Sequence, residues 1–104
     1  MAIQVVNDST FKDVLASNSK VVVKFYADWC GNCKLFSPKY KRVSNEAENA
    51  DMVFLDINAE ENPEARKAAG VDNLPFLAVF KDGQLVEGSA SNKEEYLRSI
   101  MAKL

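Results

Sequence analysis

The sequence predicts an α/β fold in which a central mixed β-sheet carries helices on both faces. Two features predict it. Runs of β-branched and aromatic residues alternate with segments of helical periodicity up to Gly70, an order typical of parallel strands joined by crossover helices. Two further runs then meet at Asp82-Gly83, a pair that favours a hairpin turn and adds antiparallel strands. The order β-α-β-α-β-α-β-β-α therefore predicts a sheet that is parallel at its start and antiparallel at its end.

The first half of the chain supplies two of the strands and two of the helices. We expect the strands at Ile3–Val6 and Val21–Tyr26, the second of them buried. Asn7-Asp8-Ser9 offers N-cap residues for a helix whose apolar side chains recur at helical spacing, at Phe11, Val14 and Leu15. A second helix begins near Cys30, with apolar positions at Phe36, Tyr40, Val43 and Ala47. Pro38 lies inside this pattern and should kink the helix.

In the second half we expect a buried strand, a short helix and a hairpin, at Met52–Ile57, Pro63–Ala69, and Phe76–Lys81 with Gln84–Glu87. Pro63 suits the first turn of the short helix, and Gly70 supplies its left-handed cap. Asn92 followed three residues later by Glu95 is typical of a capping box and predicts the start of a last helix. Its apolar stripe consists of Tyr96, Leu97, Ile100, Met101 and Leu104.

The composition predicts one domain, residues 1–104, and excludes several chemistries. The chain has 104 residues, two cysteines and no histidine, and 47% of its residues are hydrophobic. This length can bury a core without added cross-links. The lack of histidine removes Ser-His-Asp and Cys-His catalysis, imidazole zinc sites and histidine pH switches. Two cysteines cannot fill a four-thiolate zinc site or hold an iron–sulfur cluster, so we expect no metal.

The charge and hydropathy patterns argue against nucleic acid and membrane partners. The net charge is −2, and the basic residues between Lys34 and Arg42 follow a helical period typical of a solvated face, whereas phosphate binding needs clustered cations. The longest apolar run, Leu74–Phe80, has seven residues, far below the ~18 that a membrane span needs. No signal peptide is visible at Met1–Asp8, so we expect a cytoplasmic protein. There, a close cysteine pair is more often catalytic or metal-binding than a structural cross-link.

Both cysteines lie in Trp29-Cys30-Gly31-Asn32-Cys33-Lys34, where a strand gives way to a helix. Unpaired N–H groups and the helix dipole favour a thiolate there, so Cys30 should have a lowered pKa and act as a nucleophile. Cys33, one turn on, can close a disulfide with Cys30, and Gly31 should permit the tight approach. The alternatives are half of a metal site completed by a second chain, or two inert buried thiols.

Here the sequence resembles the thioredoxin family, over essentially the whole chain. Four features carry the likeness: the active-site segment Lys24–Lys34, the helix-kinking Pro38, the N-x-x-x-N-P stretch Asn58–Pro63, and the X-Pro step Leu74-Pro75, twelve residues after Pro63. The hairpin segment Phe80–Gly83 is also similar to that of the family. The resemblance implies the thioredoxin fold and thiol–disulfide oxidoreductase activity. It further implies a cis bond before Pro75, facing the cysteines.

In the implied mechanism the Cys30 thiolate attacks a disulfide of a protein substrate, and Cys33 resolves the mixed disulfide. The cofactor expectation is none bound, with Cys30-Cys33 as the redox-active disulfide. Electrons would come from an NADPH-dependent flavoprotein thioredoxin reductase, and we expect a monomer. The substrate-binding residues implied are Trp29, Gly31, Asn32, Leu74 and Pro75, the backbone of Leu74 pairing with an extended substrate segment.

Two charged residues depart from the family pattern. Lys24 stands where the family usually has a buried aspartate, and Asp56 stands on the neighbouring strand where lysine is usual. Because an unpaired buried charge is costly, we expect the two to pair. Asp56 would then take the proton-transfer role, and Lys24 would favour the thiolate of Cys33. The alternative is that Lys24 extends its ammonium group to solvent at a strand end and Asp56 is solvated.

Three further positions differ. Asn32 replaces the usual proline and predicts a less reducing couple, Ala90 replaces a glycine common near this point, and Phe76 replaces a threonine; Ala90 is given no role. The predicted function is a protein-disulfide reductase. Asn32 and Lys24 leave open an oxidase- or isomerase-leaning protein. The alternative from another class is a redox-silent interaction module with the same fold.

Overall fold

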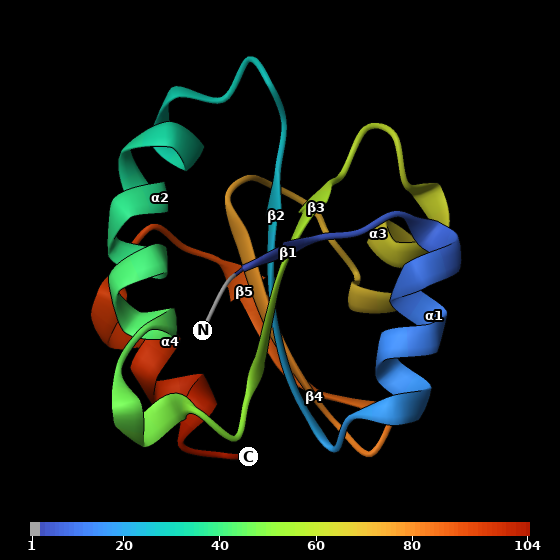
Figure 1. Cartoon of the computed structure of the whole chain (residues 1–104). Helices are drawn as coiled ribbons and strands as arrows, with labels where there is room; N and C mark the ends of the chain where they lie inside the picture. The colour runs from blue at the N-terminus through green and yellow to red at the C-terminus, as the bar shows by residue number, and fades with distance from the viewer. Residues whose placement is uncertain (1–2) are drawn as a thin grey trace.

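The computed structural model describes residues 3–104; Met1 and Ala2, the first residues of the segment in which no signal peptide is expected, lie outside the described residues. The elements in order are β1 (Gln4–Val5), α1 (Asp8–Ser17), β2 (Lys20–Tyr26), α2 (Gly31–Ser44), the 3-10 turn η1 (Ala47–Asn49), β3 (Val53–Asn58), α3 (Pro63–Ala69), β4 (Phe76–Lys81), β5 (Gln84–Ala90) and α4 (Glu94–Met101) (Figure 1). The strand order in the sheet is β1-β3-β2-β4-β5. Strands β1, β3 and β2 are parallel, whereas β4 and β5 are antiparallel to their neighbours. The predicted mixed sheet is confirmed.

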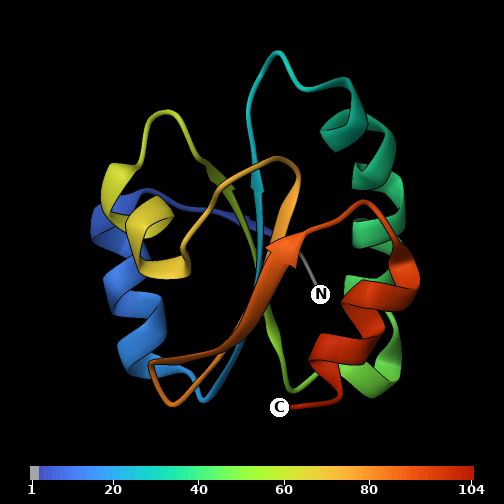
Figure 2. The ribbon, with the colours of Figure 1, turned by 180° about the vertical axis from the view of Figure 1, so that it is seen from behind.

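Two helix layers cover the sheet. Helices α1 and α3 lie on one face and α2 and α4 on the other, as the front and back views show (Figures 1 and 2). Each face has its own apolar core, and alternation along β2 sends Val21, Val23 and Phe25 into one core and Val22 into the other. By the same alternation Lys24 faces the α2 side.

Helix α2 is fastened to the sheet through Tyr40. The Tyr40 side chain is fully buried, and its hydroxyl group donates a hydrogen bond to the Leu55 carbonyl oxygen at 2.8 Å. This contact holds the helix that begins beside Cys30 in one position over β2 and β3. Pro38 lies within α2, but the helix ends at Ser44, so Ala47, which was expected to continue the pattern, lies in the separate turn η1.

The local signals for turns and caps are confirmed at three places, Asn7, Gly70 and Asp82-Gly83, and the cis bond implied by the family resemblance is also present. Asn7 caps α1 in a reciprocal capping box with Thr10. Gly70 ends α3 with φ of 71°, and Asp82 and Gly83 both have positive φ in the hairpin turn. The Leu74-Pro75 peptide bond is cis. Among the described residues, none of the helices combines the length and apolarity that a membrane crossing requires.

The predicted capping box at Asn92 is wrong. Strand β5 extends to Ala90 instead of ending at Glu87, and the Ser91 N–H continues the pairing by donating to the Pro75 carbonyl oxygen at 2.9 Å. The N-cap of α4 is therefore Lys93, and Glu95 occupies the second helical position instead of the third. No side chain of the described residues caps this helix; the Ser91 hydroxyl oxygen accepts a hydrogen bond from the Lys93 N–H at 3.1 Å.

Candidate functional site

The two cysteines form a disulfide at the N-terminus of α2. Cys30 is the N-cap residue of the helix and Cys33 lies in its first turn, with their Cα atoms 5.3 Å apart. The Cys33 N–H donates a hydrogen bond to the Cys30 sulfur at 3.1 Å, so a first-turn donor that the helix leaves unpaired already points at this sulfur. The residues are 5% and 2% exposed. Cys30 thus has only a small opening to solvent.

An apolar collar and a polar groove flank the disulfide. The side chains of Tyr26 and Leu74 pack on the small cluster that Ala27 forms with the cysteines. A groove of about 200 Å³ is lined by residues from three separate segments, Asn32, Asn73, Leu74, Pro75, Ala90, Ser91 and Asn92. The structure therefore brings together Asn32, Leu74 and Pro75, which the sequence had singled out. Asn73, Ser91 and Asn92 were missed, because the pairing of Phe76 with Ala90 places them there and no local pattern marks them.

Trp29 and Gly31 flank Cys30 on either side. Trp29 is 67% exposed and does not line that groove; its indole N–H donates to a Glu60 carboxylate oxygen at 2.7 Å. Apart from its two chain neighbours and the backbone of its own helix turn, a Cβ atom built at Gly31 would meet nothing in the described chain within 4 Å, so the structure shows no close approach to other segments that needs a glycine there. Regular helical backbone from Gly31 onward brings Cys33 to Cys30, so closure of the ring does not require a glycine.

Lys24, which is buried, and Asp56, which is partly buried, form an ion pair on adjacent strands. They are directly opposite in the parallel β2–β3 register, with the Lys24 Nζ atom 3.5 Å from Asp56 Oδ1. The Lys24 side chain is 2% exposed and that of Asp56 is 21% exposed. The alternative in which Lys24 reaches solvent is therefore contradicted, and the expected pairing is present.

Burial moves the pKa values of the two groups toward each other. Desolvation lowers the pKa of Lys24, an effect that the charge of Asp56 partly offsets. Desolvation raises the pKa of Asp56, and the charge of Lys24 partly offsets it in turn. Each group is thus pushed toward its neutral form, and a carboxyl group with a raised pKa is a better proton acceptor in neutral solution than an ordinary one.

The hydrogen bond of the Lys24 ammonium group goes to Ser37 on α2. The ammonium group donates to the Ser37 hydroxyl oxygen at 2.6 Å, and the Ser37 hydroxyl group donates to the Cys33 carbonyl oxygen at 3.0 Å. The Nζ atom also lies 5.2 Å from the centre of the Tyr40 ring. Asp56 Oδ1 is buried without a hydrogen-bond partner among the described residues. Ser37 was missed by sequence reasoning; its position four residues after Cys33 on one helix face is the signal that could have found it.

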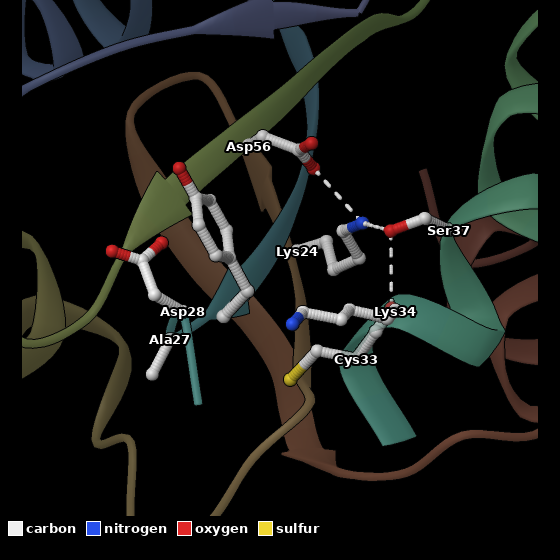
Figure 3. A pocket seen from close by; sticks show the side chains of 8 residues that line it. Lys24, Ala27, Asp28, Cys33, Lys34, Ser37 and Asp56 are labelled. Carbon is white, nitrogen blue, oxygen red and sulfur yellow. Dashed lines mark hydrogen bonds and ion pairs between the residues drawn. The ribbon is translucent and has the colours of Figure 1, made fainter. Parts of the chain in front are cut away.

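Cys33 and the charged pair line the same cavity. Its volume is about 360 Å³, and its walls come from β2 with the loop after it, from β3 and from α2. The lining residues are Lys24, Tyr26, Ala27, Asp28, Cys33, Lys34, Ser37 and Asp56. Figure 3 shows Lys24 between Asp56 and Ser37, with Cys33 on the side of the helix. A proton leaving Cys33 can therefore enter a space that also contains Asp56. Among the described residues, no group of three or more metal-binding side chains occurs.

Comparisons with known proteins agree with this geometry. The model of the Thioredoxin family matches residues 2–103. Thioredoxin-1 of Schizosaccharomyces pombe is 34% identical over 105 residues, covering 100% of both chains. The crystal structure of Malassezia sympodialis thioredoxin, at 24% identity, covers 98% of this chain and 90% of its own with a TM-score of 0.89. A chain of the ferredoxin:thioredoxin reductase–thioredoxin f2 complex gives a TM-score of 0.88 at 29% identity, covering 97% and 93%.

Proposed function

The chain belongs to the thioredoxin family of thiol–disulfide oxidoreductases, and we propose that it is a reductase of protein disulfides in which Cys30 attacks and Cys33 resolves. One observation carries the assignment of roles. Cys30 is the N-cap of α2, where its sulfur accepts a hydrogen bond from the Cys33 N–H, and it is the more exposed of the two cysteines. The same donor stabilises a thiolate at Cys30 in the dithiol form.

The reaction moves two electrons and two protons to the substrate. The Cys30 thiolate attacks one sulfur of the substrate disulfide, that bond breaks, and the released substrate thiolate takes a proton. Cys33 then loses its proton and attacks the Cys30 sulfur of the mixed disulfide. The second substrate thiol leaves with a proton, and the protein is left with the Cys30–Cys33 disulfide. Leu74, Pro75 and Asn32 border the path by which an extended substrate reaches Cys30.

Asp56 accepts the proton that Cys33 loses. Its carboxyl group lines the cavity that Cys33 also lines, and its pKa is raised by burial. The positive charge of Lys24 stabilises the Cys33 thiolate while the proton is on Asp56. The two signs are exchanged relative to the family pattern, but the division of labour between a proton acceptor and a buried cation is retained.

Insulin reduction by dithiothreitol tests the function. The wild-type protein should accelerate precipitation of the insulin B chain, and Cys30→Ser should abolish the acceleration. Equal rates with and without the wild-type protein would instead support a redox-silent interaction module. In Cys33→Ser the resolving thiol is gone, so substrates should accumulate as mixed disulfides with Cys30.

A two-phase thiol assay tests the proton transfer. Reduced protein reacts with the aromatic disulfide DTNB, and the first release of thionitrobenzoate reports attack by Cys30 whereas the second reports resolution by Cys33. Asp56→Asn should slow the second phase by about 10²-fold, and Lys24→Met much less. The matched control is Asp13→Asn, on an exposed residue of α1. Equal and small effects of the first two substitutions would remove Asp56 from the mechanism.

Each turnover leaves a disulfide, so a reductase must return two electrons to the pair. We propose an NADPH-dependent flavoprotein as that partner and a monomer as the working unit. A coupled assay with such a flavoprotein, set beside one with ferredoxin:thioredoxin reductase, decides the partner, since one related structure contains the latter enzyme.

Because the dithiol must persist for the next cycle, we propose the cytoplasm, where thiols are kept reduced, as its place of action. Thiol trapping in fractionated cells would contradict this if the protein were recovered mainly as disulfide from another compartment.

A further inference from the structure

We propose that Ser37 is a positioning residue for the resolving step, because its hydroxyl group holds the Lys24 ammonium group against the helix turn that carries Cys33. This inference rests on the proposed proton transfer from Cys33 to Asp56 and adds a residue to it. Three contacts carry it: Lys24 Nζ to Ser37 Oγ at 2.6 Å, Ser37 Oγ to the Cys33 carbonyl oxygen at 3.0 Å, and Lys24 Nζ to Asp56 Oδ1 at 3.5 Å.

The hydroxyl group joins the charged pair to the backbone of the resolving cysteine. Ser37 accepts from Lys24 and donates to the carbonyl oxygen of Cys33, one helical turn earlier. The lysine side chain is long and flexible, but its tip is held from two sides, by the serine hydroxyl group and by the Tyr40 ring at 5.2 Å. The cation is thereby placed on the wall that carries Cys33 (Figure 3).

Ser37 also sets the distance between the lysine and Asp56. The shortest contact of Lys24 Nζ is to Ser37, and Asp56 Oδ1, although 3.5 Å away, has no hydrogen-bond partner among the described residues. A buried carboxylate oxygen without a partner gains most from accepting a proton. By drawing the ammonium group toward α2, Ser37 keeps Asp56 available as a proton acceptor.

Loss of the hydroxyl group has a defined consequence. In Ser37→Ala the Lys24 ammonium group is free to close on Asp56 and form a hydrogen-bonded ion pair. Such a pair withdraws Asp56 as an acceptor and moves the positive charge away from Cys33. The resolving step should then be slower. Because the Cys33 thiolate loses a nearby cation, the pKa of Cys33 should rise, and with it the pH at which the step reaches half of its maximal rate.

The other titratable groups around Lys24 remain in place in this variant. They are Asp56 on β3, Tyr26 and Asp28 on β2 and the loop after it, and Cys33, Lys34 and Tyr40 on α2. Burial raises the pKa of both tyrosines, so they stay neutral in neutral solution. Asp28 and Lys34 are exposed and carry opposite charges. A displaced pH midpoint in Ser37→Ala therefore reports on Lys24, Asp56 and Cys33.

The experiment is the two-phase DTNB reaction, followed by stopped flow across a pH series. Ser37→Ala should slow the second phase about tenfold, less than a lost proton acceptor costs, with a higher pH midpoint and an unchanged first phase. Alanine is the better helix former, so the variant should fold. Ser37→Thr retains a hydroxyl group that can bond the same carbonyl oxygen and should restore the wild-type profile. Ser37→Ala in an Asp56→Asn background should add little further loss, since both act in one step.

Each other outcome overturns the inference. A second phase with wild-type rate and midpoint in Ser37→Ala would show that the hydroxyl group does not position Lys24. A slower second phase with an unchanged midpoint, or one that Ser37→Thr does not restore, would show a packing role only. If Asp56→Asn slows resolution while Ser37→Ala does not, the proton transfer stands and only the role of Ser37 fails. If Asp56→Asn is also without effect, the proton transfer itself is wrong.

Discussion

Lys24 and Asp56 are directly opposite each other on neighbouring parallel strands, with 3.5 Å between Nζ and Oδ1. The shorter contact of the lysine is with Ser37 on α2, at 2.6 Å. A buried cation and a partly buried carboxyl group are thus near enough to interact, and desolvation shifts the pKa of each toward its neutral form. This relationship connects the apolar packing of the sheet to the chemistry of Cys33.

The pair makes stability depend on pH with a definite sign. Burial raises the pKa of Asp56 above 3.8, so the folded state binds the proton more tightly than the unfolded chain. Wild type should therefore lose stability relative to Asp56→Asn as the pH rises from 3.8 through the raised pKa, by about 1.4 kcal/mol for each pKa unit of difference. Urea unfolding of both proteins over this range measures it, with Asp13→Asn as control.

The lowered pKa of Lys24 acts at pH values below 10.5. Between that lowered value and 10.5 the unfolded chain binds more protons, so this contribution to stability increases as the pH rises. The two contributions have opposite signs: with rising pH, stability decreases through Asp56 and increases through Lys24. A wild-type protein whose stability relative to Asp56→Asn stays constant from acid to neutral pH would contradict the burial argument.

Glu94 predicts a separate acid transition. It accepts hydrogen bonds from Arg42 on α2 and Arg98 on α4, which lower its pKa from 4.5 to about 2. Its contribution to stability is therefore complete above pH 4.5 and is lost as the pH falls toward 2. Glu94→Gln should show a shallower loss of unfolding free energy in urea over this range. Glu95→Gln, an exposed neighbour, is the control, and added salt should reduce the wild-type effect.

Phe76 and Gly88 are adapted to each other across the β4–β5 hairpin. A Cβ atom at residue 88 would lie 2.9 Å from a ring carbon of Phe76 and 3.2 Å from Ala78 Cβ. The Phe76 ring is buried edge-on against Phe25 and has little room to move. Gly88→Ala should therefore destabilise the protein by about 1–3 kcal/mol.

A double-mutant cycle in urea unfolding checks that contact. Phe76→Leu removes the ring edge, so Gly88→Ala should cost less in the Phe76→Leu background than in wild type. Ser89→Ala, on an exposed neighbour in β5, serves as the control. Additive effects of the two substitutions would mean that the ring is not what excludes a methyl group at residue 88.

Asn32→Pro should make the Cys30–Cys33 couple more reducing. Asn32 is the second residue of α2, where the N–H has no partner within the helix, so proline is compatible with the fold. Proline removes a donor that helps to stabilise thiolate and restricts the dithiol form, and both effects favour the disulfide. A shift of about 30 mV corresponds to ~1.4 kcal/mol for this couple.

Equilibration with glutathione buffers of known composition measures that potential. Asn32→Ala retains the N–H and should lie near wild type, which separates the donor from the side chain. A proline variant that proves more oxidising than wild type would invalidate the reasoning, and would remove Asn32 as an argument for an oxidase-leaning role.

The sequence by itself determined the features that depend on near neighbours along the chain. The alternation of strands and helices, the Asn7 cap, the left-handed Gly70 and the Asp82-Gly83 turn follow from backbone preferences over a few residues. The meeting of Cys30 and Cys33 is equally local, since one helical turn separates them. That Lys24 pairs with Asp56 was also predictable, because burying either charge alone is costly.

Only the tertiary structure decided what these groups do to one another. The bond of Lys24 to Ser37, the fit of Phe76 to Gly88 and the start of α4 at Glu94 depend on segments far apart in sequence. An ammonium group has three N–H donors and can bond to more than one acceptor, so the positions of the strands and of α2 set how close each one comes: Lys24 Nζ lies 2.6 Å from Ser37 and 3.5 Å from Asp56. The packing of the helices on the sheet sets these distances between side chains, and the residue pattern along the chain does not predict them.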